Sequence, residues 1–248
     1  MDHREYIREI PGAKTAFVFI HGIMGTPYQF RDLIGLVPAD CSIYNLLLDG
    51  HGGSVMDFAH SSMEKWKAQV ELTYERITGR YKTIVLVGHS MGTLFALQMV
   101  QAHSKQIPFV LLLACPVRVG LRPRMIANAL RFALGKINAA DPWQVATANA
   151  TSIRPDWRLY RYVSWVPRFL ELFREIRLTK KLLPDIKIPA YAVQSMRDEM
   201  VSPAAARILE EQSGIHVTRL PESGHFYYSP EDKKTMQELF LSLCKEYL

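Results

Sequence analysis

The sequence has few cysteines and no long hydrophobic run. Its three cysteines, Cys41, Cys115 and Cys244, are odd in number and lack the spacing of metal ligands, which argues against a disulfide framework. No apolar run approaches the ~20 residues that are needed to cross a bilayer. The first apolar run, residues 16–20, is also too short for the core of a signal peptide. We therefore expect a cytoplasmic protein with reduced cysteines, no metal ion and no integral membrane contact.

Most of the chain has no excess of basic residues. The whole sequence carries a formal net charge of +6. Residues 117–181 contain 13 Lys and Arg against 4 Asp and Glu, a net charge of +9, so the rest of the chain carries −3. Basic charge that is confined to one segment does not predict a nucleic-acid-binding protein. The arginines of this segment are typical of a solvated face, and peripheral binding to an anionic membrane surface is the alternative.

Short apolar runs recur along the chain. With 248 residues and 48% hydrophobic residues, the sequence fits one domain that spans residues 1–248. Most of the runs are separated by segments of helical periodicity, which predicts an α/β fold with a mostly parallel sheet and helices on both faces. The predicted strands are residues 16–20, 43–48, 83–87, 109–114, 190–193 and 216–220.

Capping signals mark two helices, and one gap interrupts the alternation of strands and helices. Ser61 with Glu64 predicts a capping box, and Ser229 before a proline predicts the start of the last helix. No strand signal occurs between residues 114 and 188, and the composition of residues 117–181 shifts toward arginine and aromatic residues. We interpret residues 117–181 as an insertion, with an apolar underside and outward arginines.

The segment Gly88–Gly92 has the pattern G-x-S-x-G. It lies between a β-branched apolar run, residues 83–87, and a helical pattern over residues 93–103. A sharp turn from a strand into a helix strains the backbone of its corner residue, and flanking glycines remove side chains that would collide there. We therefore predict that Ser90 lies on this corner with an exposed hydroxyl, as a candidate nucleophile.

A second glycine-containing turn, His21–Gly25, follows the first predicted strand. A serine nucleophile requires hydrogen-bond donors for the oxyanion that develops during acyl transfer. The glycines of this turn allow the Ile23 N–H to point inward, and the helix after Ser90 offers the Met91 N–H. Ile23 and Met91 are thus the predicted oxyanion hole. The alternative is that the turn only ends the strand.

His225 is the candidate general base among the eight histidines. It lies in a loop between a late predicted strand, residues 216–220, and the last helix, which is where a base is expected. His21 and His51 remain rivals, because each precedes a glycine in a loop after a strand. His89 adjoins Ser90, but we predict that it points away from the nucleophile as a packing residue.

Asp198 is the candidate carboxylate that fixes the tautomer of the base and stabilises its charged form. It follows the predicted strand at residues 190–193 and precedes a segment that leads into a helix. The neighbouring Glu199 is the nearest competitor for this role. Surface pairing of Asp198 with Arg197 is the alternative that carries no chemistry.

These motifs together resemble the α/β-hydrolase superfamily, and within it the small bacterial carboxylesterases and monoacylglycerol lipases. The resemblance covers nearly the whole chain, and the order Ser90, Asp198, His225 is the order that this fold uses. It rests on Phe19–Gly25, on Asp49–Ser54, which is similar to the family's x-G-H-G-x-S loop, on Gly88–Gly92, on Asp198 and on Ser223–His225. The resemblance implies an eight-stranded, mostly parallel sheet, with residues 117–181 as a helical lid over Ser90.

The resemblance also implies a serine esterase that needs no cofactor. His225 would deprotonate Ser90, which attacks an ester carbonyl to form an acyl-enzyme that water then releases. The expected substrates are small-molecule esters with short- to medium-chain acyl groups, or monoacylglycerols. The candidates for substrate contact are His21, Met24, Trp143 and Trp165. Any single aromatic residue of the lid has packing against the main domain as its alternative role.

Several other functions are compatible with the same residues. A thioesterase, a lysophospholipase or an acyltransferase would share the triad and differ only in leaving group or acceptor. Haloalkane dehalogenases and epoxide hydrolases place an aspartate at the strand–helix corner, so Ser90 excludes their usual mechanism. In a different class, the fold serves ligand-sensing proteins whose hydrolysis is incidental. An apolar lid surface is also compatible with a homodimer.

Overall fold

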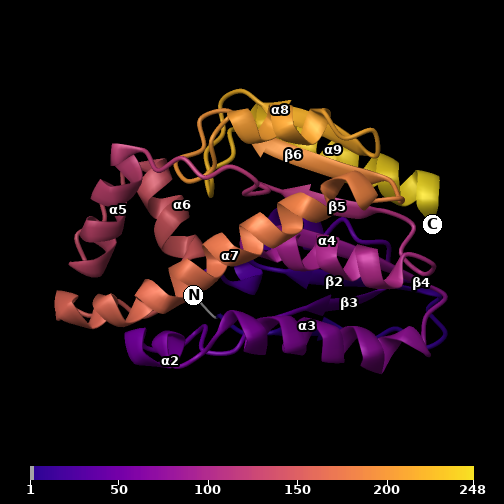
Figure 1. The fold of residues 1–248 in the computed structure, drawn as a ribbon, viewed down its shortest axis with the longest axis horizontal. Coiled ribbons are helices and arrows are strands. Elements are labelled where there is room, and N and C mark those ends of the chain that lie inside the picture. The colour runs from indigo at the N-terminus through magenta and orange to yellow at the C-terminus, as the bar shows by residue number, and fades with distance from the viewer. Residues whose placement is uncertain (1–2) are drawn as a thin grey trace.

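The structure, a computed structural model, describes residues 3–248 and contains one sheet between layers of helices (Figure 1). The described part of the chain forms seven strands in the order β1-β3-β2-β4-β5-β6-β7. They are β1 (Tyr6–Arg8), β2 (Thr15–Ile20), β3 (Ser42–Asn45), β4 (Thr83–His89), β5 (Val110–Leu113), β6 (Ala190–Ser195) and β7 (Ile215–Leu220). Strand β1 runs antiparallel to β3, and the other pairs are parallel.

This arrangement confirms the mostly parallel sheet and corrects the expected number of strands. The expectation of eight strands is wrong for residues 3–248, which form seven. Ahead of β2, the described residues form only the three-residue strand β1 and a turn. Strand β1 was not predicted, because its side chains are exposed or half-buried and carry no hydrophobic alternation.

Strand β2 separates two hydrophobic cores. Ala16, Val18 and Ile20 belong to one core, whereas Phe17 and Phe19 belong to the other. This alternation follows from the period of two along a strand, and every residue of β2 is buried. A central strand that is buried on both faces is typical of a parallel sheet with a helical layer on each side.

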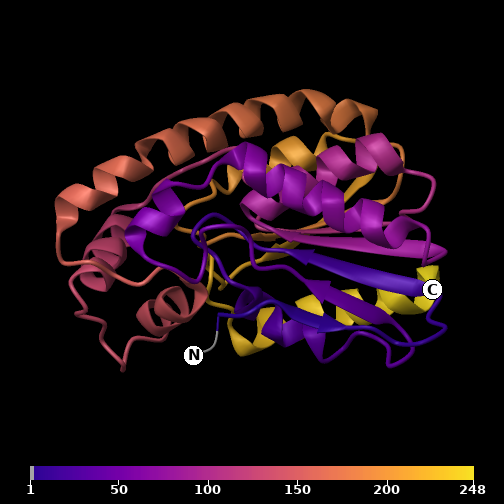
Figure 2. The same cartoon turned by 90° about the horizontal axis from the view of Figure 1, so that it is seen from below.

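Helices cover both faces of the sheet (Figures 1 and 2). Helices α1 and α9 contact each other and supply one core, while α3, α4 and α8 supply the other. Their bounds are α1 (Arg31–Ile34), α3 (Met63–Thr78), α4 (Met91–His103), α8 (Ala204–Glu210) and α9 (Pro230–Tyr247). The other helices of the described chain are η1 (Pro27–Phe30), α2 (Val55–Ala59), α5 (Pro123–Ala133), α6 (Pro142–Ala150), η2 (Leu159–Trp165), α7 (Val166–Leu182) and η3 (Leu183–Asp185).

One of the two predicted helix caps is correct and the other is displaced by one residue. The Ser229 side chain accepts a hydrogen bond from the Asp232 N–H at the start of α9, as expected. Helix α3 is capped by Ser62 and not by Ser61. The Ser61 hydroxyl instead donates to Asp49 at 2.7 Å, so a tertiary partner has replaced the local one.

The insertion, residues 117–181, contains α5, α6, η2 and α7 and adds no strand to the described sheet. Figure 1 shows α5, α6 and the N-terminal part of α7 beyond the end of the sheet toward which the β6 arrow points. The insertion therefore lies at the carboxyl ends of the parallel strands, and α7 continues along α4. Within residues 3–248, no helix has the length and the apolar composition of a membrane span.

The expected orientation of the insertion is correct only in part. Trp165 is buried, and its Nε1 donates to the Val55 carbonyl at 2.9 Å, which joins η2 to α2. Trp157 and Tyr160, however, are 78% and 70% exposed. The insertion thus has no uniform apolar underside, because only some of its aromatic residues find a partner in the main domain.

Candidate active site

Ser90 lies between β4 and α4 in a strained backbone conformation. Its φ of 51° and ψ of −120° fall in a region that residues other than glycine rarely adopt. Such a conformation costs on the order of 1–3 kcal/mol, so the surrounding structure has to enforce it. The Ser90 N–H donates to the Leu113 carbonyl at the end of β5 at 2.8 Å, and the Ser90 carbonyl accepts the Thr93 N–H at 2.9 Å. Both bonds fix the corner. Ser90 is buried there, so the prediction of an exposed hydroxyl is wrong, because the turn after β2 packs against this residue.

Two glycines allow the chain to approach Ser90 closely. A Cβ at Gly92 would lie 1.9 Å from the Ile20 carbonyl oxygen, so the start of α4 packs directly against the end of β2. A Cβ at Gly22 would lie 2.9 Å from the Cβ of Ser90. The turn that follows β2 therefore lies against the serine.

The two predicted oxyanion donors, Ile23 and Met91, have their N–H groups free of protein partners. Within residues 3–248, neither N–H donates to a main-chain or side-chain acceptor. The turn is closed by a 3.0 Å hydrogen bond from Gly25 N–H to the Gly22 carbonyl, and Met24 takes a positive φ of 56°. Both side chains are buried and apolar, so the main-chain N–H is the donor that each residue has.

Asp198 and His225 form a buried pair at the ends of β6 and β7. The Asp198 Oδ2 lies 2.8 Å from the His225 Nδ1, and both side chains are 1% exposed. The second oxygen, Oδ1, accepts the N–H groups of Met200 and Val201, each at 2.7 Å. A carboxylate that is held in this way orients an Nδ1–H and leaves the imidazole Nε2 as an acceptor. The alternative pairing is absent from the described contacts, because Arg197 binds Glu222 at 2.7 Å.

The main chain of His225 is held by two residues that were not predicted to act there. The Glu199 Oε2 accepts the His225 N–H at 2.8 Å, and the His89 Nε2 lies 3.1 Å from the His225 carbonyl oxygen. The rings of His89 and His225 are 5.0 Å apart, which places the base beside the residue that precedes Ser90. The sequence offered one signal for these contacts: Glu199 follows Asp198, and His89 precedes Ser90.

Burial controls the protonation of both residues. Burial, and then the charge of Asp198, raises the pKa of Glu199 above its ordinary value. Burial, and then the neighbouring His225, lowers the pKa of His89 to about 3. The His89 ring is therefore neutral at physiological pH, with Nε2–H as the donor to the His225 carbonyl.

The rival histidines, His21 and His51, have structural hydrogen bonds. His21 is fully buried, its Nε2 accepts the Leu48 N–H at 3.0 Å, and its Nδ1 lies 2.8 Å from the Gly22 carbonyl oxygen. His51 is held by the main-chain carbonyls of Leu48 and Asp49. Both rings thus fix loops beside the site. The predicted substrate contact of His21 has no free ring nitrogen to support it.

The remaining candidates for substrate contact pack against neighbouring segments. Trp143 stacks on Tyr227 with ring centroids 4.9 Å apart, and a Cβ at Gly224 would lie 2.2 Å from it. The Arg124 guanidinium also lies over the Trp143 ring, 4.3 Å from its centre. The Met24 carbonyl accepts the Ser152 N–H at 3.0 Å. These contacts join the insertion to the loop of His225 and to the turn after β2.

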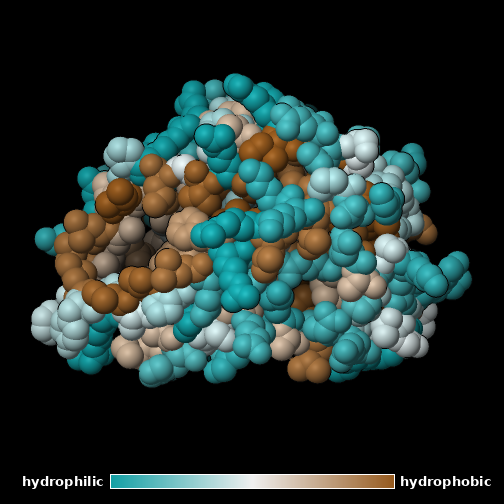
Figure 3. Space-filling view, in the orientation of Figure 1, coloured by the Kyte–Doolittle hydropathy of each residue, from teal (hydrophilic) through white to brown (hydrophobic). Residues whose placement is uncertain are grey.

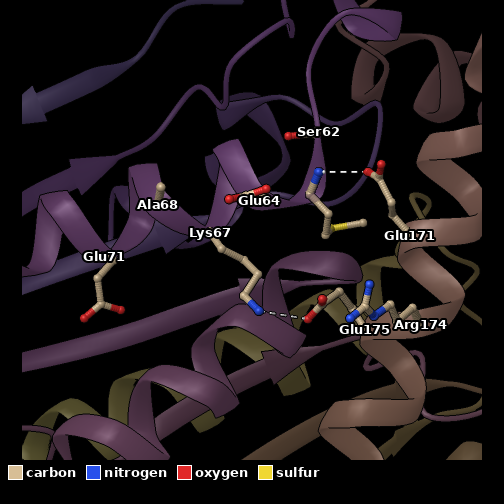
Figure 4. Close-up of a pocket in the computed structure, with 9 residues that line it drawn as sticks. Ser62, Glu64, Lys67, Ala68, Glu71, Glu171, Arg174 and Glu175 are labelled. Atoms are coloured by element: carbon tan, nitrogen blue, oxygen red, sulfur yellow. Dashed lines mark hydrogen bonds and ion pairs between the residues drawn. The ribbon is translucent and has the colours of Figure 1, made fainter.

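A separate groove lies between α3 and α7, away from the residues described above (Figure 4). Its volume is about 520 Å³. The Glu171 carboxylate accepts the Met63 N–H at 3.0 Å, and Lys67 binds Glu175 at 3.2 Å. These two contacts fasten α7 to the main domain.

Other nucleophile and metal chemistry has no support in the described residues. Burial raises the pKa of Cys41 and Cys115 to about 11 and that of Cys244 to about 12, so none is a reactive thiolate at neutral pH. Within residues 3–248, no group of three or more His, Cys, Asp or Glu side chains is arranged to hold a metal ion.

The chain is similar to known proteins over nearly its whole length. The model of the alpha/beta hydrolase family matches residues 17–235. Among solved structures, one reported for the metagenome-derived lipolytic enzymes LipS and LipT has 20% identity and a TM-score of 0.74, with 98% of each chain covered. The monoacylglycerol lipase of Paleococcus ferrophilus has 19% identity and a TM-score of 0.67, with 98% of this chain and 99% of that chain covered.

A third similar structure is the enol-lactonase of Burkholderia xenovorans, with 15% identity, a TM-score of 0.66, and 98% and 96% of the two chains covered. Among curated proteins, no significant match is found. At these identities the solved structures show a shared fold, and the match to the family model covers well over half of the chain.

Proposed function

The chain belongs to the alpha/beta hydrolase family, and from this premise we propose that it cleaves carboxylic esters through an acyl-enzyme on Ser90. The observation that carries the proposal is the common position of three separate segments. A strained serine corner, the turn after β2 and the buried Asp198–His225 pair all lie at the carboxyl ends of the strands. Ligands of open α/β sheets bind at this edge.

In the proposed reaction, the His225 Nε2 accepts the proton of the Ser90 hydroxyl while the serine oxygen attacks the ester carbonyl. The electron pair of the carbonyl moves to its oxygen, where the N–H groups of Ile23 and Met91 stabilise the negative charge. Collapse of this intermediate breaks the ester bond, and the leaving alcohol takes the proton from His225. Asp198 keeps the imidazole oriented and stabilises its charged form throughout.

The second half of the reaction restores the enzyme. Water loses a proton to His225 and adds to the acyl carbon, and the carboxylic acid then leaves as Ser90 recovers its proton. Because the reaction consists only of proton transfers and acyl transfer, the residues named above suffice without a cofactor.

We further propose that the insertion acts as a lid and that the substrates are esters of short- to medium-chain acids, or monoacylglycerols. The insertion lies at the carboxyl edge, and its Trp143 contacts the loop of His225. Proteins of the same fold include lipolytic enzymes and a monoacylglycerol lipase, which supports this substrate class without deciding the acyl length.

The proposal is tested by Ser90→Ala on a chromogenic short-chain ester and on monoacylglycerols of increasing chain length. We expect kcat to fall ~10⁴-fold or more, because no other group on the corner can accept the acyl chain. Ser104→Ala, at the other end of α4, is the matched control and should retain activity.

Two outcomes would contradict the proposal. Full activity of Ser90→Ala would remove the nucleophile assignment. Rapid labelling of wild-type Ser90 by a fluorophosphonate, with negligible turnover on esters of every length, would instead assign the chain to ligand sensing.

A further inference from the structure

Helix α5 exposes aliphatic side chains and buries a polar one, which is the opposite of a helix that covers a hydrophobic core. Ile126 and Leu130 are 63% and 50% exposed, and Leu134, at the same spacing, is 41% exposed. Residues four apart lie on one face of a helix, so these side chains form an outward apolar stripe. The buried residue of α5 is Asn128, which is polar.

The buried side chain of Asn128 also lacks hydrogen-bond partners. The side chain is 1% exposed, and within the described residues neither Oδ1 nor Nδ2 has a hydrogen-bond partner. Burial of an unpaired amide and exposure of a row of aliphatic side chains are both unfavourable in water. The exposed aliphatic stripe of α5 would therefore be more favourable in surroundings that are less polar than bulk water.

Further exposed apolar side chains lie on η2 and at the start of α7. Val163 is 69% exposed, Val166 51% and Leu170 63%. Figure 3 shows hydrophobic residues gathered around a hollow on the face where Figure 1 shows α5 and the N-terminal part of α7. We call this set the apolar rim: Ile126, Leu130, Leu134, Val163, Val166 and Leu170.

The charged residues of the segment that carries α5, residues 117–140, have one sign. Residues 117–140 contain five basic residues, all exposed, and no Asp or Glu. They are Arg118, Arg122, Arg124, Arg131 and Lys136. An apolar helix face flanked by cations fits the boundary between acyl chains and anionic headgroups. A second copy of the chain fits less well, because a symmetric contact would bring two such positive segments together.

We propose that the apolar rim and the basic residues of the segment 117–140 dock on the surface of an anionic lipid bilayer. The aliphatic side chains enter the boundary between headgroups and acyl chains, and the guanidinium groups remain among the phosphates. Because the insertion lies at the carboxyl edge of the sheet, docking turns the edge that carries Ser90 toward the lipid. This last step rests on the proposed function, and it makes esters held in a membrane the substrate class.

The docking is tested with full-length Ser90→Ala protein, so that the vesicle lipids stay intact. Its sedimentation is measured with phosphatidylcholine vesicles, with and without phosphatidylglycerol, at low and high salt. We expect binding to the anionic vesicles that weakens at high salt. Ile126→Ser with Leu130→Ser should weaken it roughly ten-fold or more. Arg131→Gln with Lys136→Gln should do the same at low salt.

The matched controls lie on the main domain. Leu72, on α3, is 63% exposed, so Leu72→Ser removes an equally exposed apolar side chain outside the apolar rim and should leave binding unchanged. Lys105→Gln serves as the charge control. Absence of binding, or equal binding by the Ile126→Ser, Leu130→Ser protein, would overturn the proposal. A dimer in sedimentation velocity that this double variant dissociates would show that the face binds a second copy instead.

Ester hydrolysis and membrane docking are tested by separate measurements. Hydrolysis of a soluble short-chain ester is measured for wild-type protein and for the double variant. Both should have equal rates, because Ile126 and Leu130 are exposed and neither is assigned to catalysis. If no ester is hydrolysed, the proposed function is wrong while the vesicle result stands. If esters are hydrolysed but vesicles are not bound, only the docking surface is wrong.

Discussion

His225 is held at three points by residues of two segments, the loop after β6 and the end of β4. Asp198 binds its Nδ1, Glu199 binds its N–H, and His89 lies within hydrogen-bonding distance of its carbonyl oxygen. A side chain positions a proton transfer only as well as its own backbone is fixed, and a displacement of about 1 Å costs on the order of 10²-fold in rate. Glu199 is therefore assigned as a positioning residue for the proposed base.

This assignment predicts different effects for two substitutions of Glu199. Glu199→Ala removes the acceptor of the His225 N–H and should lower kcat by roughly 10- to 100-fold, with little change in KM. Glu199→Gln keeps an amide oxygen as acceptor and should restore most of the activity. Steady-state kinetics on a soluble ester and a thermal melt of each variant are the measurements.

Glu222 supplies the control for this pair of variants. It precedes the same loop, and its side chain is 53% exposed in a pair with Arg197. Glu222→Ala should therefore leave kcat unchanged. Equal losses for Glu199→Ala and Glu199→Gln would show that the negative charge matters and not the acceptor.

At the scale of elements, the contact between β2 and α4 determines whether the site forms. Gly92 is the second residue of α4. The Ile20 carbonyl oxygen occupies the space that a Cβ at this position would need. This contact sets the distance between the turn that carries Ile23 and the corner that carries Ser90. The element pair therefore fixes the proposed oxyanion hole by packing.

The substitution Gly92→Ala should destabilise the protein by at least about 3 kcal/mol, or prevent folding, because backbone atoms cannot yield the space. Gly79→Ala is the matched control. Gly79 ends α3 with a φ of −80°, and a Cβ there meets no atom within 4 Å. That variant should stay within about 1 kcal/mol of wild type. Urea denaturation of both variants gives the comparison, and equal stabilities would contradict the packing argument.

At the scale of the whole molecule, three buried histidines link stability to pH. Burial, and then His51, holds the pKa of His21 well below its ordinary value. Burial also lowers the pKa of His51 to about 4 and that of His89 to about 3. All three are neutral in the folded protein under conditions where the unfolded chain begins to bind protons.

The free energy of unfolding should therefore fall on acidification. Between the folded pKa values and the unfolded value of about 6.5, the unfolded state binds more protons, so stability decreases with a slope of up to about 1.4 kcal/mol per pH unit for each histidine. Above that window the three groups contribute no slope. Urea denaturation at several pH values measures this, and His51→Gln should reduce the slope below pH 6.5. A stability that is independent of pH in this window would contradict the prediction.

The sequence predicted much of the fold and the identity of the candidate site. Strands buried on both faces, such as β2 and β4, are short apolar runs rich in β-branched and aromatic residues, and Gly88–Gly92 marks the corner by the glycines that its backbone requires. These signals are local, because they depend on residues within one turn or one strand. The short strand β1 and the cap at Ser62 lacked such a signal.

Contacts between residues far apart in the chain were determined only by the tertiary structure. His89 meets His225 across 136 residues, and Glu199 reaches the same backbone across 26. It also decided that α5 turns its aliphatic stripe outward, which the periodicity of the helix leaves open. Hydrophobic period specifies that a helix has an apolar face, whereas only the packing of other elements determines which way this face is turned.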